Sequence, residues 1–138
     1  MIAREQYMKQ IRDFIDKPVV KIITGMRRCG KSVIMDFARE EIRQRGVSEK
    51  NIFYANFESL AYEDLKNYKA LYCAVTQAAK EADGKLYIFL DEIQEVTAWE
   101  KAINSFRVDF DCDIYVTGSN AKLLSGELAT YLSGRYIQ

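Results

Sequence analysis

The sequence predicts an α/β fold in which one parallel sheet is covered by helices on both faces. Short runs rich in Val, Ile, Tyr and Phe alternate with longer amphipathic segments whose apolar residues recur at helical spacing. The short runs are apolar almost throughout, which is typical of parallel strands that are buried on both faces. The 138 residues contain neither an internal repeat nor a Pro-rich or Gly-rich linker, so we expect one domain over residues 1–138.

Taken in order, the elements begin with an amphipathic helix over residues 3–16. This helix ends at Asp16-Lys17-Pro18. A β-branched run at 19–24 predicts a strand, and the helix after the next loop runs to residue 45 with Gly46 as its C-cap. The remaining expected elements are a strand at 51–57, a long helix at 61–82, a strand at 86–90, a helix at 98–110, a strand at 114–117, a helix at 120–132 and an apolar segment beginning at 135.

Residues 25–32 match the phosphate-binding motif G-x-x-x-x-G-K-S/T in full. Gly25 and Gly30 allow successive backbone N–H groups to point at the phosphates of a nucleotide. Lys31 supplies positive charge for the β- and γ-phosphates, and the Ser32 hydroxyl is placed to bind Mg²⁺. A strand before the loop and a helix after it are the setting that the motif requires. The expected nucleotide-binding residues are Gly25, Met26, Arg27, Arg28, Cys29, Gly30, Lys31, Ser32 and Val33.

The apolar run 86–90 leads directly into Asp91 and Glu92, the pattern of a Walker B strand. Asp91 is placed to hold Mg²⁺ together with Ser32, because ligands of a parallel sheet gather at the carboxyl ends of its strands. Glu92 is placed to orient or deprotonate an attacking water. The alternative reading, a solvated acidic turn after a strand, is disfavoured by the phosphate-binding motif about 60 residues earlier.

The strand at 114–117 ends in Thr117-Gly118-Ser119-Asn120. Ser119 and Asn120 are candidates to hydrogen-bond the γ-phosphate or the attacking water. The alternative is an ordinary turn in which Asn120 caps the next helix, and one residue can do both.

Taken together, these motifs resemble those of prokaryotic AAA+ ATPases of the archaeal and bacterial STAND-like type. The resemblance is carried by Gly-Met-Arg-Arg-Cys-Gly-Lys-Ser, Phe-Leu-Asp-Glu-Ile-Gln, Thr-Gly-Ser-Asn and Leu-Ser-Gly-Arg-Tyr. It implies ATP binding and hydrolysis with Mg²⁺ on a three-layer P-loop NTPase fold of the AAA+/ASCE type. The implied sheet has the order 5-1-4-3-2.

The resemblance also implies roles for two residues outside the Walker motifs. Arg135 matches an arginine that reaches the γ-phosphate, often that of a neighbouring subunit, which implies a homo-oligomer. Asn56 resembles the polar residue that restrains the catalytic glutamate in some AAA+ proteins, with a strand-end cap as the alternative. Such proteins continue into strand five, a helical lid and a further C-terminal domain. We therefore expect a fragment whose fifth strand is incomplete or missing and whose partner is that domain or another protein.

Composition argues against several other classes of protein. The formal net charge is zero, and no basic stripe indicates that the chain binds nucleic acid. The charge is nevertheless uneven, because residues 1–50 carry twelve Lys and Arg against seven Asp and Glu. Three widely spaced cysteines and no histidine argue against a zinc site, a disulfide framework and histidine-dependent nucleophiles. Without an opening signal peptide or an apolar run of about 20 residues, we expect a cytoplasmic protein that does not cross a membrane.

Three functions agree with these observations. The first is an ATPase in which Lys31, Glu92, Ser119, Asn120 and Arg135 act on ATP. The second is a regulatory module that binds ATP or ADP, turns over negligibly and gates a partner domain. The third is a phosphotransferase with an acceptor other than water, which the Asp-Glu pair and the Thr-Gly-Ser-Asn strand end disfavour.

Overall fold

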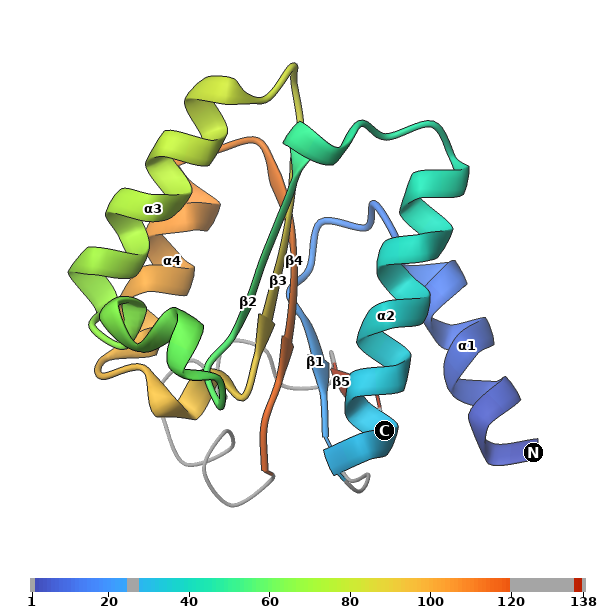
Figure 1. Ribbon diagram of the computed structural model, residues 1–138. Helices are drawn as coiled ribbons and strands as arrows, with labels where there is room; N and C mark the ends of the chain where they lie inside the picture. Colours follow the sequence, from blue (N-terminus) through green and yellow to red (C-terminus); the bar gives the residue numbers. More distant parts are fainter. Residues whose placement is uncertain (1, 25–27, 120–135, 138) are drawn as a thin grey trace.

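A parallel sheet lies between two layers of helices in the computed structural model, which describes residues 2–24, 28–119 and 136–137 (Figure 1). The strands are β1 (Lys21–Ile23), β2 (Ile52–Asn56), β3 (Leu86–Asp91), β4 (Cys112–Thr117) and β5 (Tyr136–Ile137). Their spatial order is β2-β3-β4-β1-β5, and every neighbouring pair is parallel. The predicted order is therefore confirmed, and the fifth strand that we expected to be incomplete or missing is present as two residues beside β1.

The helices cover both faces of this sheet. On one side lie α1 (Ile2–Phe14) and α2 (Arg28–Gln44), and on the other lie α3 (Tyr68–Glu81) and α4 (Trp99–Asp109) (Figure 1). This is the three-layer P-loop NTPase arrangement that the sequence predicts. The helix expected at 120–132 lies outside the described residues. None of the helices in the described part of the chain is long and apolar enough to cross a membrane.

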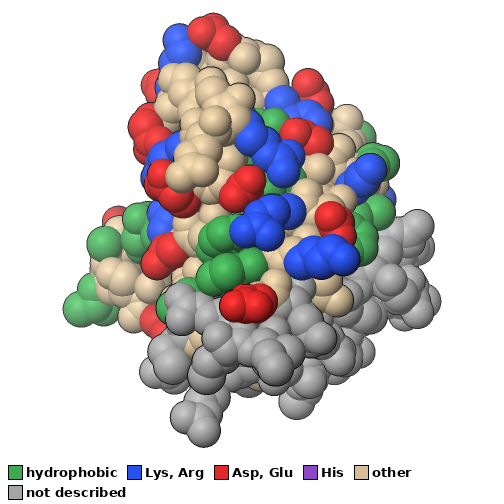
Figure 2. All heavy atoms as spheres, turned by 90° about the vertical axis from the view of Figure 1, so that its right-hand side faces the viewer, with side chains coloured by type: hydrophobic (Ala, Val, Ile, Leu, Met, Phe, Trp, Pro, Cys, Tyr) green, Lys and Arg blue, Asp and Glu red, His purple; other side chains and the backbone are tan. Residues whose placement is uncertain are grey.

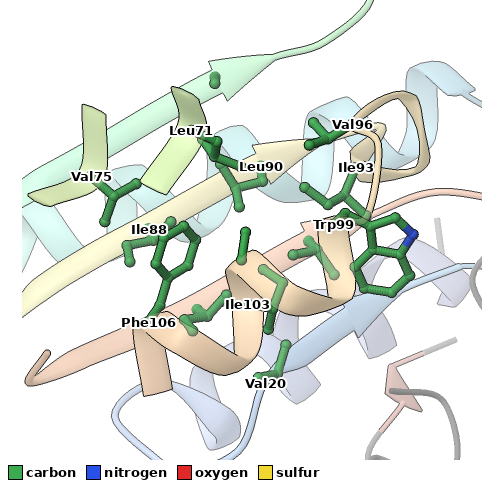
Figure 3. Close-up of a cluster of buried hydrophobic side chains, with 14 of the residues drawn as sticks. Val20, Leu71, Val75, Ile88, Leu90, Ile93, Val96, Trp99, Ile103 and Phe106 are labelled. Atoms are coloured by element: carbon green, nitrogen blue, oxygen red, sulfur yellow. The ribbon is translucent and has the colours of Figure 1, made fainter. Parts of the chain in front are cut away.

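Strands β1 to β4 send alternate side chains into two separate cores. Ile88 and Leu90 of β3 pack with α3 and α4, whereas Tyr87 and Phe89 pack with α1 and α2. Figure 3 shows the first core, where Leu71, Val75, Ile103 and Phe106 point from the helices onto β3. Because a strand has a side-chain period of two, an unbroken apolar run is what burial on both faces requires.

The long helix expected over 61–82 was wrong as a single element. The structure has a short 3₁₀ segment at Leu60–Leu65 and a separate α3 that begins at Tyr68. Asn67 divides them, because its extended backbone ends the first segment and its side chain caps the second. Lys66 and Asn67 also pair with the Thr97 segment, since Thr97 N–H donates to the Lys66 carbonyl at 3.0 Å and residue 67 forms a bridge with residue 97. Sequence periodicity does not report such a long-range contact.

Candidate active site

The predicted site residues meet at the edge of the sheet where β1, β3 and β4 end and α2 begins. Strand register aligns these ends, because Asn56 of β2 lies beside Asp91 of β3 and Ile23 of β1 lies beside Thr117 of β4. Parallel strands place all their carboxyl ends on the same edge, which is where ligands of such sheets bind. The first turn of α2 stands at this edge, so its backbone N–H groups add to the attraction for anions.

Lys31 lies in the first turn of α2 and is 6% exposed. Its Nζ lies 3.3 Å from Glu92 Oε2, and both side chains of this ion pair are 8% exposed. The same Nζ donates a hydrogen bond of 3.1 Å to the Gly118 carbonyl. Both partners accept hydrogen bonds, as phosphate oxygens do, so the ammonium group is held by contacts that a phosphate can replace.

Asp91 is 3% exposed and uses both of its carboxylate oxygens. Ser32 Oγ donates to Asp91 Oδ2 at 3.3 Å, and the Thr117 hydroxyl donates to Asp91 Oδ1. A carboxylate and a hydroxyl are the hard oxygen ligands that Mg²⁺ accepts, with water and phosphate oxygens completing the shell. Two adjacent ligands of an octahedral Mg²⁺ lie about 3 Å apart, because each Mg–O bond is about 2.1 Å. The spacing of the Ser32 and Asp91 oxygens therefore fits this ion.

Glu92 follows β3 in a left-handed backbone conformation with φ 57° and ψ 54°. Its N–H donates to Thr117 Oγ1 at 2.9 Å. Its second carboxylate oxygen, Oε1, accepts a hydrogen bond of 2.7 Å from Gln94 Nε2. Since Lys31 contacts the other oxygen, Oε2, the carboxylate has a partner on each oxygen. Glu92 as a whole is 6% exposed.

The other predicted site residues are neighbours of these groups along the chain, or lie outside the described residues. Arg28 and Cys29 open α2, and Gly30 and Val33 flank Lys31 and Ser32 on the same helix. Ser119 is partly exposed and directly follows Gly118, whose carbonyl accepts from Lys31. The remaining predicted site residues, Gly25, Met26, Arg27, Asn120 and Arg135, lie outside the described residues.

Sequence reasoning missed two side chains that contact the acidic pair. Thr117 and Gln94 contact the acidic pair directly, although only Ser119 and Asn120 were expected to act from the end of β4. The signal for Thr117 was present, because a hydroxyl at the end of a neighbouring strand has the reach to contact Asp91. For Asn56 the structure shows the alternative that was given, the strand-end cap, because its Oδ1 accepts from Glu58 N–H at 3.1 Å. Within the described chain, the amide that contacts Glu92 belongs to Gln94.

Comparison with known proteins agrees with this geometry. A family model described as an AAA domain matches residues 17–138. An uncharacterized protein of Haemophilus influenzae is 45% identical over 138 residues, which cover 100% of this chain and 34% of that protein. An uncharacterized protein of Methanocaldococcus jannaschii is 31% identical over 124 residues, which cover 86% of this chain and 25% of that protein. The chain thus spans about a third or less of the length of these relatives. No solved structure matches it.

Proposed function

The chain belongs to the AAA domain family of P-loop ATPases, and we propose that it binds ATP with Mg²⁺ and hydrolyses it. The observation that most supports this proposal is the meeting of Lys31, Ser32, Asp91 and Glu92 at one edge of the sheet. These side chains come from two segments about 60 residues apart in the sequence. A cation, a metal-binding hydroxyl, a metal-binding carboxylate and a base are the groups that nucleotide hydrolysis needs.

In this proposal, the Ser32 hydroxyl and Asp91 Oδ2 would hold the metal. When bound there, Mg²⁺ would supply positive charge that offsets the negative charge developing on the phosphate. Gly25 to Val33 surround the phosphates with backbone N–H groups and the positive end of α2. Lys31 adds the charge of its ammonium group.

Nucleotide binding then changes the partners of Lys31. Its ammonium group leaves Glu92 and the Gly118 carbonyl and contacts the phosphates, which together carry more negative charge than the single carboxylate of Glu92. Glu92 is thereby freed from its ion pair while it keeps the hydrogen bond from Gln94. The carboxylate is then available to a water molecule at the same edge.

For hydrolysis, Glu92 accepts a proton from the attacking water as its oxygen forms a bond with the γ-phosphorus. The bond from that phosphorus to the oxygen bridging the β-phosphate breaks, and ADP leaves with the electron pair. Ser119 and Asn120 are proposed to hydrogen-bond the γ-phosphate or the water. Arg135 is proposed to approach the same charge, either within one chain or from a neighbouring subunit.

The decisive experiment compares phosphate release and ATP binding in the parent chain and in Glu92→Gln. We expect Glu92→Gln to lose turnover by 100-fold or more, on the order of the effect of removing a general base. We expect it to bind ATP at least as tightly, because Lys31 no longer has a carboxylate partner to leave. Glu95→Gln is the matched control, since Glu95 is exposed and lies in the same turn.

A nucleotide-gated regulatory module is the second candidate function. The Lys31–Glu92 ion pair favours it, because breaking that pair on binding would couple nucleotide to the position of the Glu92 segment. Such a module binds ATP or ADP with negligible turnover in the parent chain, so Glu92→Gln has little turnover to lose. ADP formation that needs an added acceptor and yields no free phosphate would instead indicate a phosphotransferase, because the phosphoryl group then ends on the acceptor.

The partner of this domain is also a proposal. The family resemblance of the motifs supports a C-terminal domain or another protein as the part that hydrolysis drives or gates, and the relatives are long enough to hold a further domain. If Arg135 acts between subunits, specific activity should rise with protein concentration, and Arg135→Ala should abolish that rise. Activity that is independent of concentration would place Arg135 in its own site or outside the chemistry.

A further inference from the structure

Thr117 is the last residue of β4 and is fully buried. Strand register brings the end of β4 beside the end of β3, because Val116 lies opposite Leu90. The Thr117 side chain therefore lies next to the acidic pair that follows Leu90.

The Thr117 hydroxyl makes two hydrogen bonds of opposite sense. It donates to Asp91 Oδ1 and accepts from the Glu92 N–H at 2.9 Å. A hydroxyl can donate and accept at once, whereas a carboxylate only accepts and an ammonium group only donates. Both acidic residues are thus tied to one atom of the neighbouring strand.

The contact with Asp91 decides which of its oxygens faces the metal site. With Oδ1 engaged by Thr117, the carboxylate turns Oδ2 toward Ser32 Oγ at 3.3 Å. A residue that hydrogen-bonds a metal ligand in this way fixes its orientation and tunes its affinity for the metal.

The contact with Glu92 acts on the backbone. The backbone of Glu92 has a left-handed conformation, which residues other than glycine keep only when their surroundings hold them there. The hydrogen bond from its N–H to Thr117 is one such restraint, and it acts where the chain leaves β3 and aims the carboxylate at Lys31.

We propose that Thr117 is a positioning residue that orients Asp91 for the metal and Glu92 for the attacking water. This inference rests on the proposed function, because it assigns Thr117 a role in the same site. Thr117 contacts neither phosphate nor water in this role and acts through the two acidic residues.

The test compares Thr117→Val with Thr117→Ser in the 138-residue chain. Valine keeps the shape but removes the donor and the acceptor, whereas serine keeps both. We expect Thr117→Val to bind ATP normally without Mg²⁺, but to show a weaker gain in ATP affinity on adding Mg²⁺ and a lower kcat. Each effect should be about 10- to 100-fold, the usual range for residues that support a metal ligand. Thr117→Ser should recover most of both.

A control variant, an amide resonance and a replacement variant separate loss of the Thr117 hydroxyl from general effects of a substitution. Thr76→Val is the matched control, because its hydroxyl donates to the Tyr72 carbonyl on α3 and takes no part in the site. The amide proton resonance of Glu92 should move upfield in Thr117→Val and stay in place in Thr117→Ser, as a readout without nucleotide. If Thr117→Val does not fold, Thr117→Ala replaces it, because it also lacks the hydroxyl.

The outcomes separate this inference from the proposed function. If the parent chain hydrolyses ATP and Thr117→Val keeps its kcat and its Mg²⁺ dependence, the role of Thr117 is overturned and the ATPase stands. If Thr117→Ser is as impaired as Thr117→Val, packing rather than the hydroxyl is responsible, and the role is again overturned. If the parent chain binds no ATP, the proposed function is overturned, and the role of Thr117 is overturned as well because it depends on that function.

Discussion

Lys21 and Asp113 form an ion pair away from the proposed site, with both side chains 1% exposed. Lys21 Nζ also donates to the Lys17 carbonyl at 2.6 Å. Asp113 Oδ2 accepts from Asp16 N–H at 2.9 Å and from the Tyr115 hydroxyl at 2.6 Å. Burial of two charges is tolerated here because each has several hydrogen-bond partners. The pair joins the first residue of β1 to the second residue of β4, and its hydrogen bonds add the connector between α1 and β1.

Replacing one partner of this pair should be costly. We expect Lys21→Met to lower the free energy of unfolding by about 3 kcal/mol, because it leaves the Asp113 charge buried without its cation. Urea unfolding followed by circular dichroism measures the loss. Lys66→Met is the control, since Lys66 pairs with Glu63 at the surface, where such a pair contributes about 0–1 kcal/mol. Similar losses in the two variants would contradict the prediction.

The chemical site was predictable at the residues that belong to spaced motifs. Lys31, Ser32, Asp91 and Glu92 were named from their spacing alone, and they lie together in the structure. Gln94 and Thr117 were not assigned a role, because their contacts with Glu92 depend on a left-handed turn and on the register of two strands. The left-handed turn at Glu92 has no local signature in the sequence, whereas the Thr117 hydroxyl at the end of a neighbouring strand was a signal that could have been used.

At the scale of elements, the N-terminus of α3 shows how one side chain fixes a boundary. Asn67 Oδ1 accepts from Lys69 N–H at 2.8 Å and from Ala70 N–H at 3.3 Å. These bonds satisfy two of the N–H groups that the first turn of any helix leaves free. They also explain why the segment 61–82 is not one helix.

Removing this cap should lower stability by a modest amount. We expect Asn67→Ala to lower the free energy of unfolding by about 1 kcal/mol. Ser48→Ala is the control, because Ser48 precedes the 3₁₀ segment Glu49–Asn51 without a side-chain cap hydrogen bond. Thermal unfolding of the two variants beside the parent chain measures both effects. An equal shift for Ser48→Ala would mean that the capping bonds of Asn67 contribute nothing.

Strand positions were easier to predict than helix boundaries. The apolar runs at 51–57, 86–90 and 114–117 each contain most of a strand, because burial on both faces demands nearly every residue be apolar. The strand predicted at 19–24 was longer than β1, since only Lys21–Ile23 pair with the neighbouring strands. Strand order could not be read from periodicity and came from the family resemblance.

Across the whole molecule, charge is distributed differently on the surface and inside. Figure 2 shows basic and acidic side chains mixed over the face of α1 and α2. Ion pairs join several of them, including Arg12 with Glu41 and Arg43 with Glu40. Inside, the charged groups gather at the two ends of the sheet, with Lys31, Asp91 and Glu92 at the carboxyl end and Lys21 and Asp113 near the amino end.

The buried tyrosines at the amino end of the sheet make stability depend on alkaline pH. Burial raises the pKa of Tyr115, and the charge and hydrogen bond of Asp113 raise it further. Burial likewise raises the pKa of Tyr87, whose hydroxyl donates to Asp16 Oδ1 at 2.7 Å. Lys21 has the opposite effect on the pH dependence of stability. Burial lowers its pKa, so the folded chain releases the Lys21 proton at a lower pH than the unfolded chain does.

The sign follows from which state holds the protons. Above about pH 10, the unfolded tyrosines ionise while the folded ones stay protonated, so rising pH favours unfolding. We therefore expect the free energy of unfolding to fall above pH 10, because two tyrosines outweigh the single Lys21. Tyr115→Phe removes one of these protons, so its decline should be shallower by up to about 1.4 kcal/mol per pH unit. Urea unfolding from pH 8 to 11 measures the slope, with Tyr68→Phe as the hydroxyl-loss control. An unchanged slope in Tyr115→Phe would mean that Tyr115 ionises alike in both states.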